Sequence, residues 1–209
     1  MTTQPYGAAP VEIGHFKLRK PELLFVQYMP IKLAGSSRWA VPSNLQPFAP
    51  LMEHVDCQKD DYVYVTARHL FVGAGAIPNR PGWHADGFGT SDVNYIWADS
   101  IPTEFCVQPF ALSDDHSISM AQMEKQARPE NFRTYPDETL LRLDASVIHR
   151  PAVAKVSGFR VFVKFSVSRD RYDLEGNAHN PLLDYDWPLH ARAVARNNPS
   201  AQQHMELAE

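Results

Sequence analysis

The sequence predicts a mainly β protein with flanking helices, in which the strands roll into a small barrel. Two observations predict this class. Several segments alternate apolar and polar residues with the period of two that strands require. Seventeen prolines are scattered between short apolar segments, a pattern that favours a loop-rich β architecture over a helical bundle. With 209 residues and 44% hydrophobic content, the chain is expected to form one domain, residues 1–209, around a full core.

Strands are expected in sequence order at residues 61–68, 93–99, 104–110, 140–144 and 160–168. The second and third are joined across residues 100–103 in a hairpin-like manner. In the last strand, one row is wholly apolar and the other is mostly polar: Arg160, Phe162, Lys164, Ser166 and Ser168. This polar row either faces water or lines a barrel cavity that holds a charged ligand, and alternation alone leaves both open.

Two helices are expected, one before the first of these strands and one between the third and the fourth. Residues 50–55 form a short helix, because Pro50 suits a first helical position and the apolar residues after it share a face. The best helix candidate is an insertion at residues 117–127. Its caps are Asp114 and Asp115, and its apolar face is Met120, Met123 and Ala127. A polar, frayed tail is expected after about residue 197.

Charge and composition exclude several classes of function. A formal net charge of -4 gives no basis for general nucleic-acid binding, which needs a dense Lys/Arg face. No apolar run approaches the roughly 20 residues that cross a bilayer, and the first residues have neither a basic start nor an apolar stretch. Cys57 and Cys106 are expected to be reduced and unpaired. The expected location is therefore cytoplasmic, without a membrane partner.

The sharpest local feature is the stretch Gly-Trp-His-Ala-Asp-Gly at residues 82–87. Residues two apart on a strand point to the same side, so His84 and Asp86 can reach one metal ion. His149 is the preferred third ligand, because an antiparallel neighbour would bring it beside His84. Two imidazoles and one carboxylate on one face of an ion leave open coordination positions, the arrangement of non-haem Fe(II) oxygenases.

With Arg160 one strand beyond His149, the set resembles the 2-oxoglutarate- and Fe(II)-dependent oxygenase superfamily, whose pattern is His-x-Asp, a long interval, His and then a basic residue. The resemblance covers mainly residues 61–168, the expected barrel core. It implies a double-stranded β-helix, or jelly roll, of the cupin-like type. It also implies that His84, Asp86 and His149 are catalytic ligands of Fe(II), and that Arg160 pairs with the distal carboxylate of the co-substrate 2-oxoglutarate.

One position departs from the family pattern: Phe162 stands where many members carry a serine, two residues beyond the arginine. Lys164, on the same expected face, is an alternative partner for the anion. Tyr95 and Asn94 are candidates for further polar contacts to the co-substrate.

The resemblance implies an enzyme, a non-haem dioxygenase that hydroxylates or demethylates an unidentified small-molecule or macromolecular substrate. Two alternatives stay open. One is a cupin-like metalloenzyme that does not consume 2-oxoglutarate, and the other is a non-catalytic jelly-roll binding module. A phosphate-binding turn is rejected at residues 73–75, because Pro78 and Pro81 oppose the helix that it requires.

Overall fold

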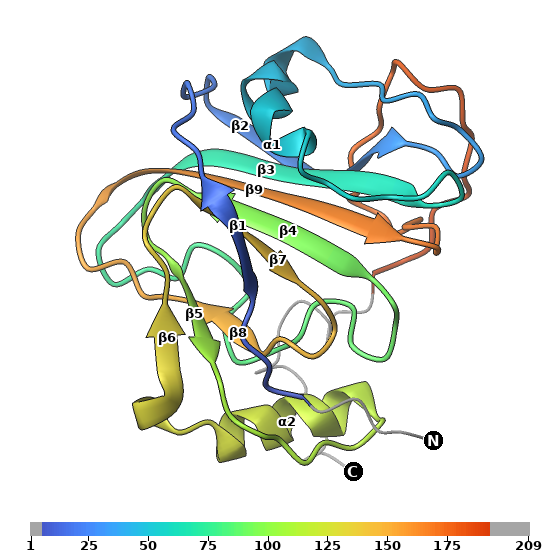
Figure 1. Cartoon of the computed structure of the whole chain (residues 1–209). Coiled ribbons are helices and arrows are strands. Elements are labelled where there is room, and N and C mark those ends of the chain that lie inside the picture. The colour runs from blue at the N-terminus through green and yellow to red at the C-terminus, as the bar shows by residue number, and fades with distance from the viewer. Residues whose placement is uncertain (1–5, 193–209) are drawn as a thin grey trace.

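Two antiparallel sheets face each other in the computed structural model, which describes residues 6–192 (Figure 1). Within these residues the larger sheet has six strands in the order β1-β7-β4-β9-β3-β2. They are β1 (Val11–His15), β2 (Leu24–Lys32), β3 (Tyr62–Val72), β4 (Val93–Ala98), β7 (Thr139–Leu143) and β9 (Gly158–Ser168). The smaller sheet has the order β6-β5-β8, with β5 (Thr103–Cys106), β6 (Phe132–Thr134) and β8 (His149–Pro151). The chain is thus a mainly β jelly roll, as predicted.

The outer face of the larger sheet carries the main core. Val163 and Phe165 of β9 pack with Val65 of β3 beneath the 3-10 helix η1 (Ser43–Phe48) and the short helix α1 (Ala49–Met52). Figure 1 shows α1 above β3 and β9. The predicted helix at residues 50–55 is therefore confirmed in place, although its α-helical part ends at Met52.

Helix α2 (His116–Gln126) packs below the smaller sheet (Figure 1), where Met123 joins a buried apolar cluster with Trp83, Cys106 and Ile148. The carboxylate of Asp115 accepts hydrogen bonds from the backbone N–H groups of the first turn, so this residue is the cap that the sequence predicts. The 3-10 helix η2 (Pro129–Asn131) then leads into β6.

The structure decides which way the polar row of β9 faces. Phe162 belongs to a buried cluster that includes Phe105 and Val147 of the smaller sheet and its flank, so it points into the space between the sheets. Because side chains alternate along a strand, Arg160, Lys164 and Ser166 point the same way. The row therefore lines the barrel interior rather than facing water.

The predicted hairpin across residues 100–103 is wrong. β4 pairs with β7 and β9, whereas β5 pairs with β6 and β8 in the other sheet. Ile101 adopts a positive φ of 51°, a rare conformation for a β-branched residue, and the chain passes from one sheet to the other there. β5 also ends at Cys106, earlier than the predicted residue 110.

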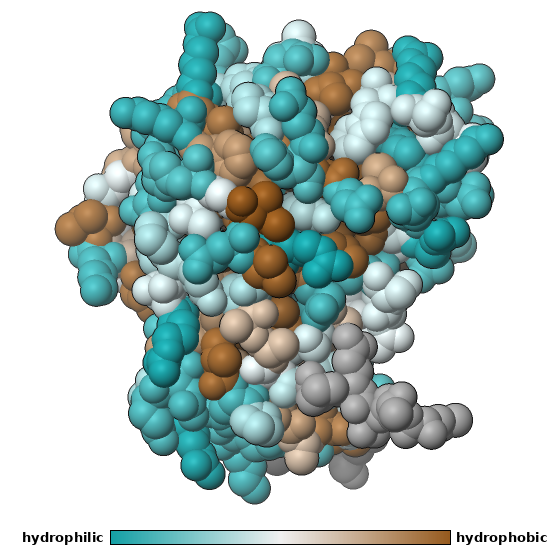
Figure 2. All heavy atoms as spheres, viewed as in Figure 1, coloured by the Kyte–Doolittle hydropathy of each residue, from teal (hydrophilic) through white to brown (hydrophobic). Residues whose placement is uncertain are grey.

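Other expectations concern the surface and the chain ends. No helix in residues 6–192 is long and apolar enough to cross a membrane. Hydrophilic residues dominate the outline of the face in Figure 2, and apolar residues gather mainly in its middle. Cys57 and Cys106 are both free thiols, as predicted. The tail expected after about residue 197 lies outside the described residues.

Truncating Phe165 to alanine should lower the free energy of unfolding by about 3–5 kcal/mol, because this side chain is fully buried in the main core. Phe159→Ala is the matched control: it lies on the same strand, is 53% exposed, and should change stability by no more than about 0.5 kcal/mol. Urea unfolding measures both. Equal losses in the two variants would contradict the assignment of this face as the core.

Candidate metal centre

His84, Asp86 and His149 converge, as the sequence predicts. One ligand atom from each lies within 4.8 Å of the others, and this is the group able to hold a metal ion within the described residues. The backbones of His84 and His149 form an antiparallel bridge, in which the two residues exchange N–H···O bonds of 3.0 and 2.9 Å. Such a bridge places both side chains on the same side of the sheet, and the two imidazole centres are 4.5 Å apart.

Both imidazoles are oriented by backbone carbonyl groups. His84 Nδ1 lies 2.8 Å from the carbonyl oxygen of Gly82, and His149 Nδ1 lies 3.1 Å from that of Val147. A carbonyl oxygen only accepts hydrogen bonds, so each Nδ1 carries the proton and each Nε2 presents a lone pair. Metal-binding histidines have this same arrangement, which sets the tautomer and the ring direction.

The charge states of the group suit a cation. Burial, followed by the neighbouring His149, lowers the pKa of His84 to about 3, so its imidazole is neutral at physiological pH. Burial alone would raise the pKa of Asp86, but the charge of Lys164 and then the neighbouring His149 hold it well below its usual range. A neutral imidazole at His84 and an ionised carboxylate at Asp86 are the protonation states that metal binding requires of these two residues.

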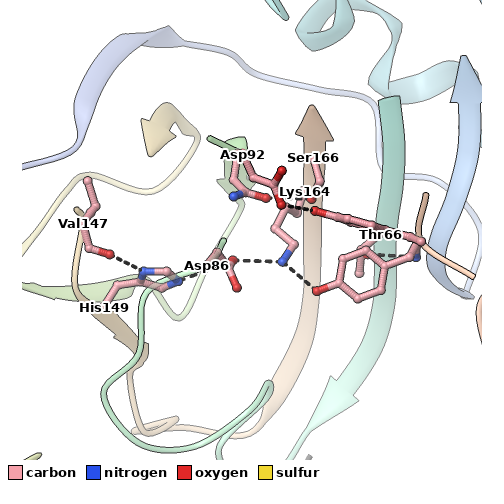
Figure 3. Close-up of polar contacts among 10 residues, drawn as sticks. Thr66, Asp86, Asp92, Val147, His149, Lys164 and Ser166 are labelled. Carbon is pink, nitrogen blue, oxygen red and sulfur yellow. Dashed lines mark hydrogen bonds and ion pairs between the residues drawn. The ribbon is translucent and has the colours of Figure 1, made fainter. Parts of the chain in front are cut away.

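Lys164 and Tyr28 extend the group across the barrel. Lys164 Nζ lies 2.9 Å from Asp86 Oδ2 and donates to Tyr28 Oη at 3.1 Å. On its other side, Asp86 Oδ2 lies 3.6 Å from His149 Nε2. Figure 3 shows the Asp86 carboxylate between the His149 imidazole and the Lys164 ammonium group. Burial would lower the pKa of Lys164, but Asp86 and Tyr28 raise it, so the residue is a buried cation.

A local backbone strain aims Tyr28 at this group. The pairing of β2 with β3 shifts register between Val26 and Met29, which marks a β-bulge, and Tyr28 within it has φ of 45°. Its backbone N–H donates to Thr66 Oγ1 at 3.0 Å. Bulges redirect side chains and occur near functional sites. Here the bulge turns a phenol into the barrel beside Lys164.

Gly87 allows the chain to turn directly after Asp86. It has φ of 71°, and a Cβ at this position would lie 2.7 Å from the Cβ of Asp92. A residue other than glycine would therefore push Asp92 or the Asp86 backbone out of place.

The remaining predicted site residues divide between the two faces of β4. Asn94 points into the barrel, where its Oδ1 accepts a 2.6 Å hydrogen bond from Ser166. Tyr95 lies on the opposite face within the main core, and its hydroxyl accepts from the backbone N–H of Asp56. The prediction that Tyr95 belongs to the site is therefore wrong, because adjacent residues of a strand point to opposite faces and Asn94 is the one that faces the barrel.

Arg160 lies on the inward row, four residues before Lys164, or about 13 Å along the strand. Its Nε donates to the carbonyl oxygens of Ser100 and Ile101 at 2.9 and 3.1 Å. Its Nη2 is buried without a hydrogen-bond partner. Burial lowers the pKa of Arg160 to about 10, and the guanidinium stays charged at neutral pH.

A second, half-buried guanidinium lies near Arg160. Arg68 is paired in register with Phe162 on the neighbouring strand, so it shares the inward face. Its Nη1 donates to Pro78 O and Asn79 Oδ1, whereas its Nε is buried and has no hydrogen-bond partner. Both arginines thus have unused donors in the interior, and the carboxyl groups of Asp99 and Asp137 lie close enough to Arg160 to favour its charged form.

Sequence reasoning missed Tyr28, Thr66, Arg68, Asp92 and Tyr172. Thr66 and Arg68 share one face of the alternating segment 61–68. In β3 they pair with Lys164 and Phe162 of β9, so they face the barrel interior together with the inward row of β9. Asp92 and Tyr172 are joined by a 2.7 Å hydrogen bond over 80 residues of sequence, for which there is no local signal.

The sequence matches no protein-family model and no curated protein. Among solved structures, the fold is similar to the crystal structure of EvdO2 from Micromonospora carbonacea var. aurantiaca. The sequence identity is 14% and the TM-score is 0.38, and the match covers 69% of this chain and 67% of that chain. A crystal structure of EvdO2 complexed with 2-oxoglutarate gives 12% identity and a TM-score of 0.33 over 75% and 83%. Likeness at this level does not bear on function.

In metal-free protein, the free energy of unfolding should fall by about 2 kcal/mol between about pH 7 and about pH 5 through His84. The pKa of His84 is lower in the folded protein than the value of about 6.5 in the unfolded chain. Below that value the unfolded chain binds a proton that the folded protein does not, so the free energy of unfolding falls as the pH falls. Urea unfolding with a chelator, compared between wild type and His84→Gln, isolates this residue. Identical pH profiles for the two proteins would contradict the burial of a neutral imidazole.

Proposed function

We propose that this protein is an Fe(II)- and 2-oxoglutarate-dependent oxygenase that hydroxylates or demethylates a substrate still to be identified. The observation that carries the proposal is the convergence of His84, Asp86 and His149, in which one potential ligand atom from each residue lies within 4.8 Å of the others. Two imidazoles and one carboxylate, with open positions, form the donor set of non-haem Fe(II) oxygenases.

The residues of this chain fit both the metal and an anionic co-substrate. His84, Asp86 and His149 would hold the ion. The buried, unpartnered donors of Arg160 and Arg68 are groups that a carboxylate would satisfy. A dicarboxylate with a keto group beside one end suits such a site, because one end chelates a metal and the other pairs with a guanidinium.

Fe(II), 2-oxoglutarate and dioxygen together supply oxidative decarboxylation to succinate and CO2, with one oxygen atom passed to a substrate C–H bond. The chain positions these groups and limits water. Phe162, Phe105 and Val147 make the space between the sheets apolar, which strengthens charge interactions there. Lys164 holds the Asp86 carboxylate in place through its 2.9 Å contact.

Access to the metal centre lies on the side of Asp86. The Asp86 side chain is 21% exposed, whereas that of His149 is 7% exposed. A substrate would therefore approach past Asp86, opposite the apolar interior.

A second candidate is a cupin-like metalloenzyme that does not use 2-oxoglutarate. Phe162 favours it, because the centre of its ring lies 4.9 Å from Arg160 Cζ. The ring stands beside the guanidinium, where the distal carboxylate of 2-oxoglutarate would bind, and it offers that carboxylate no hydrogen-bond donor. A non-catalytic binding module is the third, and it predicts no metal binding.

Anaerobic addition of Fe(II) and then 2-oxoglutarate should give a visible metal-to-ligand charge-transfer band. His149→Ala should lose the band and stoichiometric iron binding, because two remaining ligands hold the ion weakly. Iron binding without a band in folded wild type would favour the second candidate. No iron binding would favour the third.

Arg160→Ala should weaken 2-oxoglutarate binding about 10- to 100-fold, the range for losing a charge-assisted contact to a carboxylate, and should leave iron affinity largely unchanged. Lys164→Met tests the alternative anion partner in the same titration. A loss confined to Lys164→Met would transfer the co-substrate role to Lys164. Loss of both ligands in Arg160→Ala would make that residue structural.

A further inference from the structure

Six aromatic side chains connect the candidate metal centre with the molecular surface. They come from β2, from β3 and from the segment that follows β9: Tyr28, Tyr62, Tyr64, Tyr172, Tyr185 and Trp187. Each ring lies against the next along this set, which we call the aromatic path.

The inner half of the path is separated from Asp86 by a single side chain, that of Lys164. Lys164 bridges Asp86 and the hydroxyl of Tyr28 at 2.9 and 3.1 Å. The Tyr28 ring meets Tyr172 edge-on with 5.3 Å between centres. Tyr172 then stacks on Tyr64 at 4.2 Å with an interplanar angle of 8°. Stacked π systems at this separation couple electronically.

The outer half leads to solvent. Tyr64 stacks with Tyr62 at 5.9 Å, and Tyr62 contacts Trp187 edge-on at 5.7 Å. Trp187 packs on Tyr185 at 4.6 Å. Both outer residues are half-buried, so the path ends where small molecules in solution have access.

Tyr172 has a proton acceptor in place. Its hydroxyl donates to Asp92 Oδ2 at 2.7 Å, and Asp92 is buried. A phenol that loses an electron becomes a strong acid, and a carboxylate at this distance takes the proton and later returns it. Oxidation of Tyr172 therefore needs no proton exchange with water.

All six members of the path are Tyr or Trp, although phenylalanine is the most frequent aromatic residue in the chain, with 11 Phe against 8 Tyr and 4 Trp. The hydroxyls of Tyr28, Tyr64 and Tyr185 also form hydrogen bonds that phenylalanine would lose. Tyr and Trp are the aromatic side chains that proteins oxidise reversibly by one electron.

We propose that the aromatic path carries electrons from the surface to the metal centre and so removes oxidising equivalents that no substrate consumes. This role rests on the proposed function, since the oxidant is the one formed there from iron and dioxygen or peroxide. Each step moves one electron inward. Tyr172 gives up an electron through Tyr28 to the oxidant and passes its own proton to Asp92. The oxidant takes one proton from solvent with each electron, so that two transfers leave water. An electron from Trp187, relayed through Tyr62 and Tyr64, restores the phenol as the proton returns. An external one-electron reductant of the ascorbate class then reduces Trp187 and leaves oxidised.

The first experiment tests conduction without any metal. Flash-quenched ruthenium tris-bipyridine in solution oxidises exposed aromatic residues, and electron paramagnetic resonance detects the radical that follows. Wild type should form a tyrosyl radical whose yield falls several-fold in Tyr172→Phe and in Trp187→Phe. Tyr135→Phe is the matched control, because Tyr135 packs on Phe105 outside the path and should have no effect. Equal yields in all variants would overturn conduction along the path.

The second experiment tests the protective role. Fe(II)-loaded protein receives hydrogen peroxide without substrate, and peptide mass spectrometry maps oxidation at His84 and His149. Trp187→Phe, with its fold verified by circular dichroism, should show several-fold more ligand oxidation than wild type, and ascorbate should protect wild type more. An unchanged oxidation map would overturn the role. Failure to bind iron would overturn the proposed function and the protective role together, whereas the metal-free experiment still decides conduction.

Discussion

The pair of backbone hydrogen bonds between His84 and His149 is the constraint on which the site depends. It joins the loop after β3 to the edge of the smaller sheet, and it places two imidazoles on the same side at a fixed separation. Asp86 follows two residues later and so reaches the same point. Carbonyl groups two residues before each histidine then fix both tautomers. Backbone geometry, rather than side-chain contacts, thus assembles the donor set.

Charged side chains inside the barrel are the second feature that defines the site. Asp86 is the acidic member of the metal-binding group, and Lys164 offsets it in the absence of an ion. Arg160, which is buried, and Arg68, which is half-buried, have unused donors further along the interior, and Asp99 lies near Arg160. Burying such groups is costly unless a partner is supplied. The interior is therefore built to receive negative charge, which explains why a strand in the middle of the larger sheet carries a polar row.

The sequence was sufficient for those parts of the fold and site that follow a local period. Alternation located β3 and β9, and the spacing of His84 and Asp86 with a later His149 predicted correctly that these three side chains converge. It failed where geometry is not local. The positive φ of Ile101 sends the chain to the other sheet in place of a hairpin, and the bulge at Tyr28 reverses the face of that residue. Tyr95 lies in the main core, on the face of β4 opposite to Asn94, because side chains alternate along a strand.

The central claim is that three side chains hold one metal ion, and anomalous diffraction from crystals loaded anaerobically with Fe(II) tests it most directly. The account predicts a single strong iron peak within coordination distance of His84 Nε2, His149 Nε2 and an Asp86 carboxylate oxygen. A fully loaded crystal with its iron peak elsewhere, or with one of the two imidazoles turned away from the ion, would contradict the account.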